Sequence, residues 1–376
     1  MGSDHLSLDE ASQFKNWHKL LPAAEYLEYD GRRSCSFSLP PTTPNMSTIS
    51  EVQSALTKII DKKVKHSVFL WGPPGIGKSS IVKKVAQDNK LELVDLRISQ
   101  LAPTDLRGLP YIENGQAKFA PPTFLPTKGK GILCVDEFNM ASPSMMGIAQ
   151  QLILDRQVGD YVVPADWFII AAGNRTEDRA AVSQMPAPVA NRFIHFNVDA
   201  DLASWKEYAI KTGVNEQIIS FLNFRPQLLF NFNKNATAWP SPRSWEFANT
   251  LLDVDIDIEA AVGGGTAAEF YAYQSIYSRL PDVDAVIAGE SVDVPTEPSL
   301  MYAVCGALVS RSKTPAGFFN AVKWLIGGTT EDYVGLFMGD ALIAMKANNL
   351  QGAFIKLAAK DSQIKAFITK YQELLK

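Results

Sequence analysis

Residues 72–79 read Gly72-Pro73-Pro74-Gly75-Ile76-Gly77-Lys78-Ser79, which fits the pattern G-x-x-x-x-G-K-[ST] of a phosphate-binding loop. The preceding residues 67–71 are predicted to form a short buried strand, and residues 79–88 have the apolar spacing of a helix. A strand, a glycine-rich loop and a helix in this order are the context that the motif requires. The stretch therefore predicts a nucleotide-binding site in an α/β fold.

Each position of the loop has an expected role in that site. The glycines let successive backbone N–H groups turn toward the β-phosphate, and the start of the helix adds a partial positive charge. Lys78 is expected to reach the β- and γ-phosphates, and the hydroxyl of Ser79 is expected to bind Mg²⁺. The residues expected to contact ATP are Gly72, Pro73, Pro74, Gly75, Ile76, Gly77, Lys78, Ser79 and Ser80.

The composition is that of an ordinary soluble globular protein. Of the 376 residues, 46% are hydrophobic and 20% are charged, and this length suits two domains plus an extension. No apolar run approaches the roughly 18 residues of a membrane span. The formal net charge of −4 gives no overall electrostatic attraction for nucleic acid, so DNA binding is not the expected function.

The cysteines are Cys35, Cys134 and Cys305, far apart and without C-x-x-C spacing. This pattern argues against both a disulfide framework and a zinc site. The start of the chain also lacks the charged and then apolar architecture of a signal peptide. The sequence therefore favours a protein of the reducing cytoplasm.

Three regions follow along the chain. Residues 1–45, which include a Pro/Thr-rich linker at 39–44, are interpreted as a loosely attached extension, and Met46 could be the native start. Residues 46–235 are expected to form an α/β nucleotide-binding domain, beginning with a capped helix near 47–56. Its other strands are predicted at 91–96, 131–135 and 167–172, which indicates a mostly parallel sheet between helices. Residues 236–376 have helical periodicity and are expected to form an all-α lid domain.

Two insertions interrupt the strands. Residues 101–126 are rich in proline and contain a predicted hairpin around Asn114-Gly115, and residues 156–164 read as a second short hairpin. In the helical region, the stretch 251–300 carries ten acidic residues and one basic residue, Arg279. This stretch is interpreted as a negative, solvated face.

A second motif follows about 60 residues after the loop. Residues 132–137 form an apolar strand that ends in the carboxylates Asp136 and Glu137. Asp136 is expected to hold Mg²⁺ through water, and Glu137 is expected to polarise the attacking water, because hydrolysis requires mainly positioning and charge neutralisation around the γ-phosphate.

Three further residues are candidates for the same chemistry. Asn174 follows the next strand and is expected to orient water near the γ-phosphate, although an Asn-Arg pair also suits a plain turn. Arg192 is a candidate charge donor supplied in trans, and the alternative is a surface arginine. Arg243 is expected to report phosphate occupancy to a mobile lid, and the alternative is an arginine at a helix start without a ligand.

With these motifs in order, the chain resembles a MoxR-like AAA+ ATPase over roughly residues 47–376. The resemblance rests on residues 72–79 as Walker A, 134–137 as Walker B, 171–174 as sensor 1, 185–193 as the arginine-finger segment and 241–245 as sensor 2. The insertion at 101–126 resembles the family's helix-2 insert, and residues 156–164 resemble its pre-sensor-1 hairpin. Sensor 1 departs from the family pattern, since many members have Ala-Thr-Gln-Asn-Pro where this chain has Ala-Ala-Gly-Asn-Arg at 171–175.

The resemblance implies a homo-oligomeric ring, a hexamer, with Mg²⁺ and ATP bound at each subunit boundary and Arg192 completing the neighbour's site. It also implies that ATP hydrolysis remodels or activates a protein client, with a von Willebrand factor A-domain protein as partner. Two other functions remain open at this point. One is a nucleotide-gated scaffold with slow hydrolysis. The other is a DNA-directed motor, for which Lys118 and the Lys128-Gly129-Lys130 stretch offer some positive charge against the acidic balance.

Overall fold

The structure is a computed structural model that describes residues 46–175, 178 and 185–374. These residues form two compact units, which divide between Asp201 and Leu202. The boundary expected from the sequence, between residues 235 and 236, lies inside the second unit. The expected extension at 1–45 lies outside the described residues.

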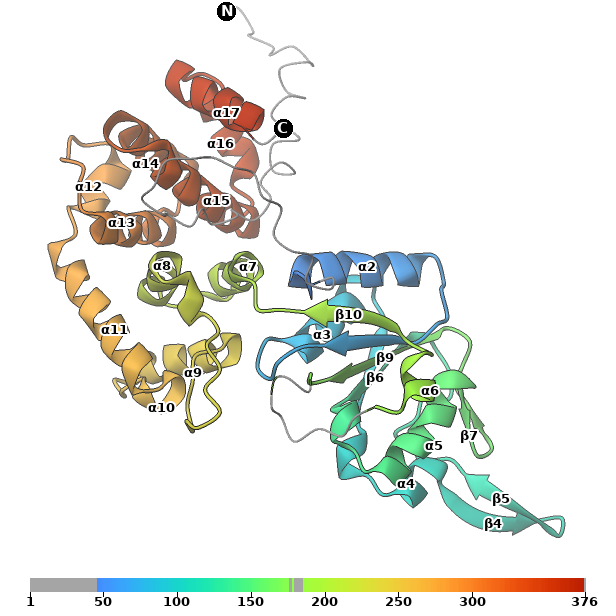
Figure 1. Cartoon of the computed structure of the whole chain (residues 1–376). Helices are drawn as coiled ribbons and strands as arrows, with labels where there is room; N and C mark the ends of the chain where they lie inside the picture. The colour runs from blue at the N-terminus through green and yellow to red at the C-terminus, as the bar shows by residue number, and fades with distance from the viewer. Residues whose placement is uncertain (1–45, 176–177, 179–184, 375–376) are drawn as a thin grey trace, which may run out of the picture. The chain divides into compact units, whose positions relative to one another are not determined.

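The first unit is built on a six-stranded parallel sheet (Figure 1). In spatial order the strands are β1 (Met46–Ser47), β10 (Ile194–Val198), β2 (Val68–Trp71), β9 (Trp167–Gly173), β6 (Gly131–Asp136) and β3 (Glu92–Arg97). Every neighbouring pair is parallel, so the carboxyl ends of all the strands meet at one edge. The predicted α/β fold is confirmed, including the strands β2, β3, β6 and β9. The sequence did not predict β10, because His195 and Asn197 interrupt its short apolar pattern.

Helices cover both faces of this sheet. On one face lie α2 (Ile49–Asp61) and α3 (Lys78–Asp88), and on the other lies α5 (Pro143–Leu154). Side chains alternate along a strand, so Leu133 and Val135 join α5 in one core cluster while the buried Cys134 between them faces away from it. This double cover explains why the central strands are nearly continuous apolar runs.

The expected capped helix is α2. Thr48 is its N-cap: the Thr48 hydroxyl accepts from the backbone N–H of Glu51 at 3.2 Å, and the Glu51 carboxylate accepts from the backbone N–H of Thr48 at 2.9 Å. This reciprocal pair satisfies two of the N–H groups that a helix start leaves without partners.

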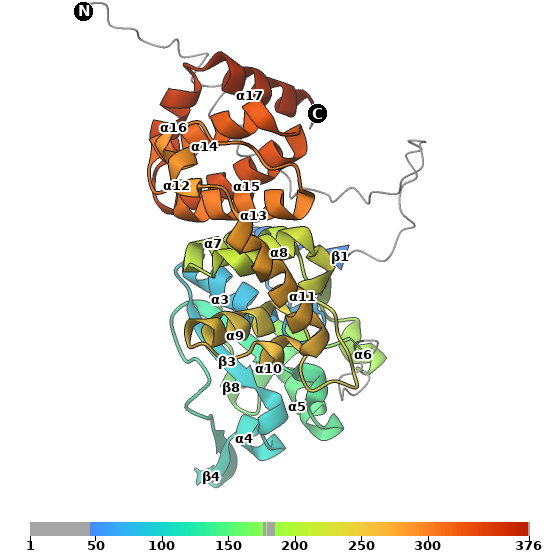
Figure 2. The same cartoon turned by 90° about the vertical axis from the view of Figure 1, so that its left-hand side faces the viewer.

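Both insertions form hairpins, as predicted. In the first, β4 (Leu109–Glu113) pairs with β5 (Gln116–Ala120) around Asn114-Gly115, where both φ angles are positive, at 52° and 76°. The second pairs β7 (Gln157–Val158) with β8 (Tyr161–Val162). The Asp160 carboxylate accepts a hydrogen bond from the backbone N–H of Phe119 at 2.7 Å, which ties the two hairpins together. In both views the β4–β5 hairpin extends away from the sheet (Figure 1, Figure 2).

The second unit is helical, which confirms the all-α character expected for the C-terminal part of the chain. Its helices are α7 (Leu202–Thr212), α8 (Glu216–Phe224), α9 (Pro242–Asp253), α10 (Glu259–Val262), α11 (Gly264–Gln274), α12 (Val283–Ala288), α13 (Pro298–Arg311), α14 (Pro315–Gly328), α15 (Glu331–Ala347), α16 (Gln351–Ala358) and α17 (Ser362–Leu374). None of the helices in the described part of the chain is long and apolar enough to cross a membrane.

The boundary lies earlier than the sequence suggested because α7 and α8 pack on helices far downstream. Helix α7 contacts α15, and α8 contacts α13. The buried Lys206 and Asp340 form an ion pair at 2.6 Å, and Asn223 donates to the second Asp340 oxygen at 3.0 Å. This network joins α7, α8 and α15 into one body.

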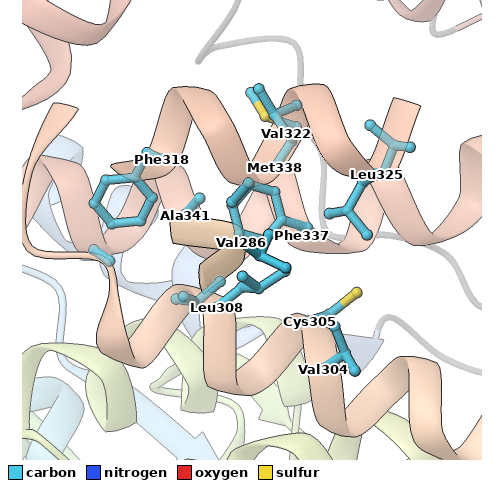
Figure 3. Close-up of a cluster of buried hydrophobic side chains, with 14 of the residues drawn as sticks. Val286, Val304, Cys305, Leu308, Phe318, Val322, Leu325, Phe337, Met338 and Ala341 are labelled. Atoms are coloured by element: carbon cyan, nitrogen blue, oxygen red, sulfur yellow. The ribbon is translucent and has the colours of Figure 1, made fainter. Parts of the chain in front are cut away.

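The core of the helical unit is made of side chains from helices α12 to α17, and Figure 3 shows part of it. Phe318, Phe337 and Leu308 are almost completely buried there, and Cys305 points its thiol into the same apolar cluster. Burial raises the pKa of the Cys305 thiol, so this cysteine acts as a small apolar core residue.

Candidate nucleotide-binding site

The phosphate-binding loop connects β2 to α3 at the carboxyl edge of the sheet. Gly75 and Gly77 have φ angles of 84° and 99°, a region that other residues enter only with strain. A Cβ on Gly72 would lie 2.5 Å from the Val198 carbonyl oxygen and 2.6 Å from Ile76 Cδ1, so the loop is packed against the end of β10. Gly77 caps α3 without a side chain, which leaves the first N–H groups of α3 for an anion.

Lys78 is held at the base of this loop. Its ammonium donates to the carbonyl oxygens of Gly72 at 2.7 Å and Pro73 at 2.9 Å, and to Oδ1 of Asn174 at 2.9 Å. The side chain is buried, so water screens its charge only weakly. A bound phosphate oxygen would compete with these acceptors for the ammonium N–H groups.

Ser79 and the end of β6 form the candidate metal position. The Ser79 hydroxyl donates to Oδ2 of Asp136 at 2.5 Å, and the other Asp136 oxygen accepts from the backbone N–H of Glu137 at 2.9 Å. A hydroxyl and one carboxylate are the few protein ligands that Mg²⁺ takes beside phosphates and water. The residues present therefore fit a magnesium ion bound with ATP.

Glu137 has an unusual backbone conformation. Its φ of 54° places it in the left-handed region, which costs a residue with a side chain energy and is often found at functional sites. Its carboxylate accepts a hydrogen bond at 2.8 Å from the hydroxyl of Ser99, which lies in a 3₁₀ turn (Ile98–Gln100) after β3. Sequence reasoning missed Ser99, because only the neighbouring positions of β3 and β6 in the sheet bring it to Glu137.

Asn174 follows β9, and a buried amide supports it. The Asn139 side chain, 2% exposed, donates to the Asn174 carbonyl at 2.7 Å and accepts from the Asn174 N–H at 3.2 Å. Sequence reasoning also missed Asn139. Its position two residues after Glu137, between the apolar residues Phe138 and Met140, is a sequence signal for a buried polar role.

A third missed residue, His195, lies on β10 beside the loop. Its Nδ1 accepts from the indole N–H of Trp71 at 2.8 Å, and its Nε2 donates to the carbonyl of Ala190 at 2.8 Å. The two rings are stacked, with an interplanar angle of 24°. His195 therefore connects the residue before Gly72 to the segment that carries Arg192.

The structure does not bring Arg192 together with the other candidate residues. It follows α6 (Ala187–Ala190), is exposed, and lines a groove of about 480 Å³ beside α5. The rest of this groove is lined by Gly147, Gln150, Gln151, Leu154 and Asp155. In the described part of the chain, no hydrogen bond or ion pair joins its side chain to Lys78, Glu137 or Asn174. The expected arginine-finger segment, residues 185–193, lies within the described residues, and residues 179–184 directly before it lie outside them.

Arg243 belongs to the second unit, where it is the second residue of α9. It belongs to the first turn of α9, which begins after a cap in which Ser241 and Ser244 bond reciprocally. Its expected role as sensor 2 remains a prediction, as do the roles of Glu137, Asn174 and Arg192. Of the loop residues, Ile76 is buried and Ser80 is exposed on α3.

The carboxylates at this edge repel one another. Burial, together with the charge of Asp136, raises the pKa of Asp95 on β3, and Arg97 partly offsets this effect. Burial also raises the pKa of the Cys134 thiol, which excludes it as a nucleophile near neutral pH. The negative charge of Asp95, Asp136 and Glu137 would be stabilised by a divalent cation at Asp136.

Comparison with known proteins agrees with this geometry. Residues 67–193 match the family model of the AAA domain (dynein-related subfamily). An AAA-ATPase of Arabidopsis thaliana is 27% identical over 123 residues, which are 29% of this chain and 31% of that protein. The match thus spans less than a third of the length of this relative.

The solved structures with some similarity to this chain include a RuvB variant of Thermotoga maritima and NtrX of Brucella abortus in complex with ATP. The RuvB variant is 14% identical, with a TM-score of 0.37, covering 76% of this chain and 86% of its own. NtrX is 14% identical, with a TM-score of 0.38, covering 91% of this chain and 72% of its own. The family match and the loop geometry together identify residues 67–193 as an AAA+ ATPase domain.

Proposed function

We propose that this chain is a MoxR-like AAA+ ATPase that hydrolyses ATP at the boundaries between subunits of a ring and uses the energy to remodel or activate a protein client. The observation that carries the proposal is the convergence of Lys78, Ser79, Asp136, Glu137 and Asn174 at one edge of the sheet. Arg192, by contrast, is exposed beside a groove and makes no described contact with them.

The proposed mechanism assigns one task to each group. The loop N–H groups and Lys78 hold the β- and γ-phosphates, and Asp136 and Ser79 would hold a magnesium ion, which neutralises the phosphate charge when bound. Glu137 accepts the proton of the attacking water, and Asn174 orients that water. Arg192 of a neighbouring subunit stabilises the charge that develops on the γ-phosphate, a contribution of about 10³- to 10⁵-fold where such an arginine acts in trans.

A mixing experiment tests this arrangement. Lys78→Ala should lose nucleotide binding, and Arg192→Ala should bind ATP without hydrolysing it. A mixture of the two should regain part of the activity, because an Arg192→Ala subunit keeps an intact loop and a Lys78→Ala subunit can supply the arginine. If the mixture stays inactive although affinity purification through a tag on one variant recovers the other variant with it, the trans role of Arg192 is wrong.

The ring and the client are tested separately. We expect Glu137→Gln protein with ATP and Mg²⁺ to assemble into about six subunits by mass photometry, because heterologous interfaces that close give rings. A von Willebrand factor A-domain protein is the proposed partner, and its addition should raise the ATPase rate. A monomer under all conditions would contradict the ring.

One observation favours a second function, a nucleotide-gated scaffold with slow hydrolysis. The Ser99 hydroxyl holds the carboxylate of Glu137 at 2.8 Å, and a carboxylate held in this way is less free to accept a proton from water. A scaffold would assemble with ATP and show no increase in turnover when a partner protein binds.

A further inference from the structure

The amide of Asn139 pairs with the peptide groups that flank the side chain of Asn174. Asn139 lies in the 3₁₀ turn Phe138–Met140, directly after Glu137, and is 2% exposed. Its Nδ2 donates to the Asn174 carbonyl at 2.7 Å, and its Oδ1 accepts from the Asn174 N–H at 3.2 Å. The donor and the acceptor of the Asn139 side chain therefore both bond to the backbone of Asn174, which lies 35 positions away.

The neighbouring glycine makes this pairing possible. A Cβ on Gly173 would lie 2.5 Å from Oδ1 of Asn139 and 2.8 Å from Cζ of Phe69. Real side chains essentially never approach so closely, so any larger residue would push the amide away from the backbone. Gly173 is also one of the positions at which this chain departs from the expected sensor 1 pattern.

Asn174 in turn holds Lys78, since its Oδ1 accepts from the ammonium at 2.9 Å. A continuous series of hydrogen bonds thus runs from Asn139 through Asn174 to Lys78 and the carbonyls of Gly72 and Pro73. Glu137 is the N-cap of the short turn that contains Asn139. The buried amide of Asn139 therefore joins the turn that follows Glu137, the proposed base, to the backbone of Asn174, the proposed sensor 1 residue.

From these contacts we propose that Asn139 is a positioning residue. It fixes the backbone of Asn174, so that the side chain of Asn174 faces the γ-phosphate and keeps its position relative to Glu137. The inference rests on the proposed ATPase function and adds a residue to its machinery. Because Asn139 is buried behind the backbone of residues 173–174, it acts through Asn174 and not on ATP.

The test compares two nucleotides that differ at the γ-phosphate. Dissociation constants of the full-length chain for Mg²⁺–AMP-PNP and Mg²⁺–ADP are measured by calorimetry, and kcat is measured by phosphate release. For Asn139→Ala we expect the preference for AMP-PNP over ADP to fall about tenfold and kcat to fall about 10- to 100-fold, as expected for two lost hydrogen bonds. The affinity for ADP should change less than about twofold.

Asn223→Ala serves as the matched control. Asn223 is also fully buried, at 1% exposed, and donates its Nδ2 to a single acceptor, Asp340. This variant should lower the melting temperature and leave the AMP-PNP preference unchanged. The inference is wrong if Asn139→Ala lowers only the melting temperature, or if Asn223→Ala shifts the preference equally. If the wild-type chain neither prefers AMP-PNP nor hydrolyses ATP, the proposed function itself fails.

Two further variants protect the test against misfolding. Asn139→Leu fills nearly the same volume and removes both hydrogen bonds to Asn174 without adding a buried charge, so it should reproduce the loss of preference if Asn139→Ala does not fold. Gly173→Ala displaces the amide from the other side and should give the same phenotype. The double variant Asn139→Ala, Gly173→Ala should lose no more preference than the worse single variant, because both act on one contact. Additive losses would show that the two residues act independently.

Discussion

Replacement of Ser99 by alanine should raise the basal rate of ATP hydrolysis. The Ser99 hydroxyl donates to Oε2 of Glu137 at 2.8 Å, and Glu137 has a left-handed φ of 54°. The carboxylate that should accept a proton from water is thus engaged by another donor. Loss of the hydroxyl would free this carboxylate without altering the phosphate-binding loop.

The magnitude follows from the strength of that bond. A hydrogen bond to a charged group contributes about 1.5–3 kcal/mol. Ser99 and Glu137 are both partly exposed, so water weakens the bond and the lower end of the range applies. About 1.4 kcal/mol corresponds to a factor of ten, and we therefore expect the basal kcat to rise about tenfold.

Steady-state phosphate release at saturating ATP measures this effect, with the dissociation constant for ADP as a check on the loop. Ser54→Ala, which removes an exposed serine on α2, is the control and should behave as wild type. A Ser99→Ala variant with lower turnover and normal ADP affinity would refute the reasoning, because it would mean that Ser99 orients Glu137 for catalysis. Unchanged turnover would also refute it.

Three other changes should give distinct results. Gly72→Ala forces a Cβ to within 2.5 Å of the Val198 carbonyl oxygen, so calorimetry should show an ATP affinity about 10- to 100-fold lower. An affinity equal to wild type would contradict the packing of the loop on β10. Asp340→Ala leaves the buried charge of Lys206 without a counterion, so urea unfolding should show that the free energy of unfolding falls by about 3–5 kcal/mol. A double variant that also lacks the charge of Lys206 should recover part of this stability. Gly339→Ala adds a Cβ that meets nothing within 4 Å inside α15, so the free energy of unfolding should rise by about 0.5–1 kcal/mol, and a decrease would show hidden crowding.

The elements that the sequence predicted well are those whose signal is local. The loop at 72–79 needs its glycines and lysine in consecutive positions, and the apolar strand before Asp136 reads directly as buried β structure. The hairpin at Asn114-Gly115 is equally local, because both residues adopt the positive φ that the turn requires. In each case a few adjacent residues determine both the conformation and the chemistry.

The residues that the sequence did not reveal act through contacts between distant segments. The bond from Ser99 to Glu137 spans 38 positions, that from Asn139 to Asn174 spans 35, and that from Trp71 to His195 spans 124. No local pattern distinguishes these polar residues from solvated ones. The strand order of the sheet brings them together, because β2 lies between β10 and β9, and β6 lies between β9 and β3.

The boundary between the two units illustrates the same limit. Residues 202–224 carry ordinary helical patterns, and nothing in those patterns assigns α7 and α8 to either unit. The assignment depends on the buried pair of Lys206 and Asp340, whose members are 134 positions apart. A lysine on an amphipathic helix is predicted to be exposed unless a buried counterion is known, because lysine is rarely buried without a partner.

Sensor 1 departs from the expected pattern at residues 172, 173 and 175, and the structure gives a physical explanation for Gly173 and Arg175. Gly173 makes room for the amide of Asn139, which pairs with the backbone of Asn174. Arg175 donates to the Val198 carbonyl at 2.9 Å and pairs with the Asp199 carboxylate, so it fastens the loop after β9 to the end of β10. A proline at this position could do neither, because it has no donor side chain.

Gly72 packs against the same Val198 carbonyl. The end of β10 is therefore a shared support for the phosphate-binding loop and for the residues around Asn174, and a displacement of β10 would move both sides of the nucleotide site together.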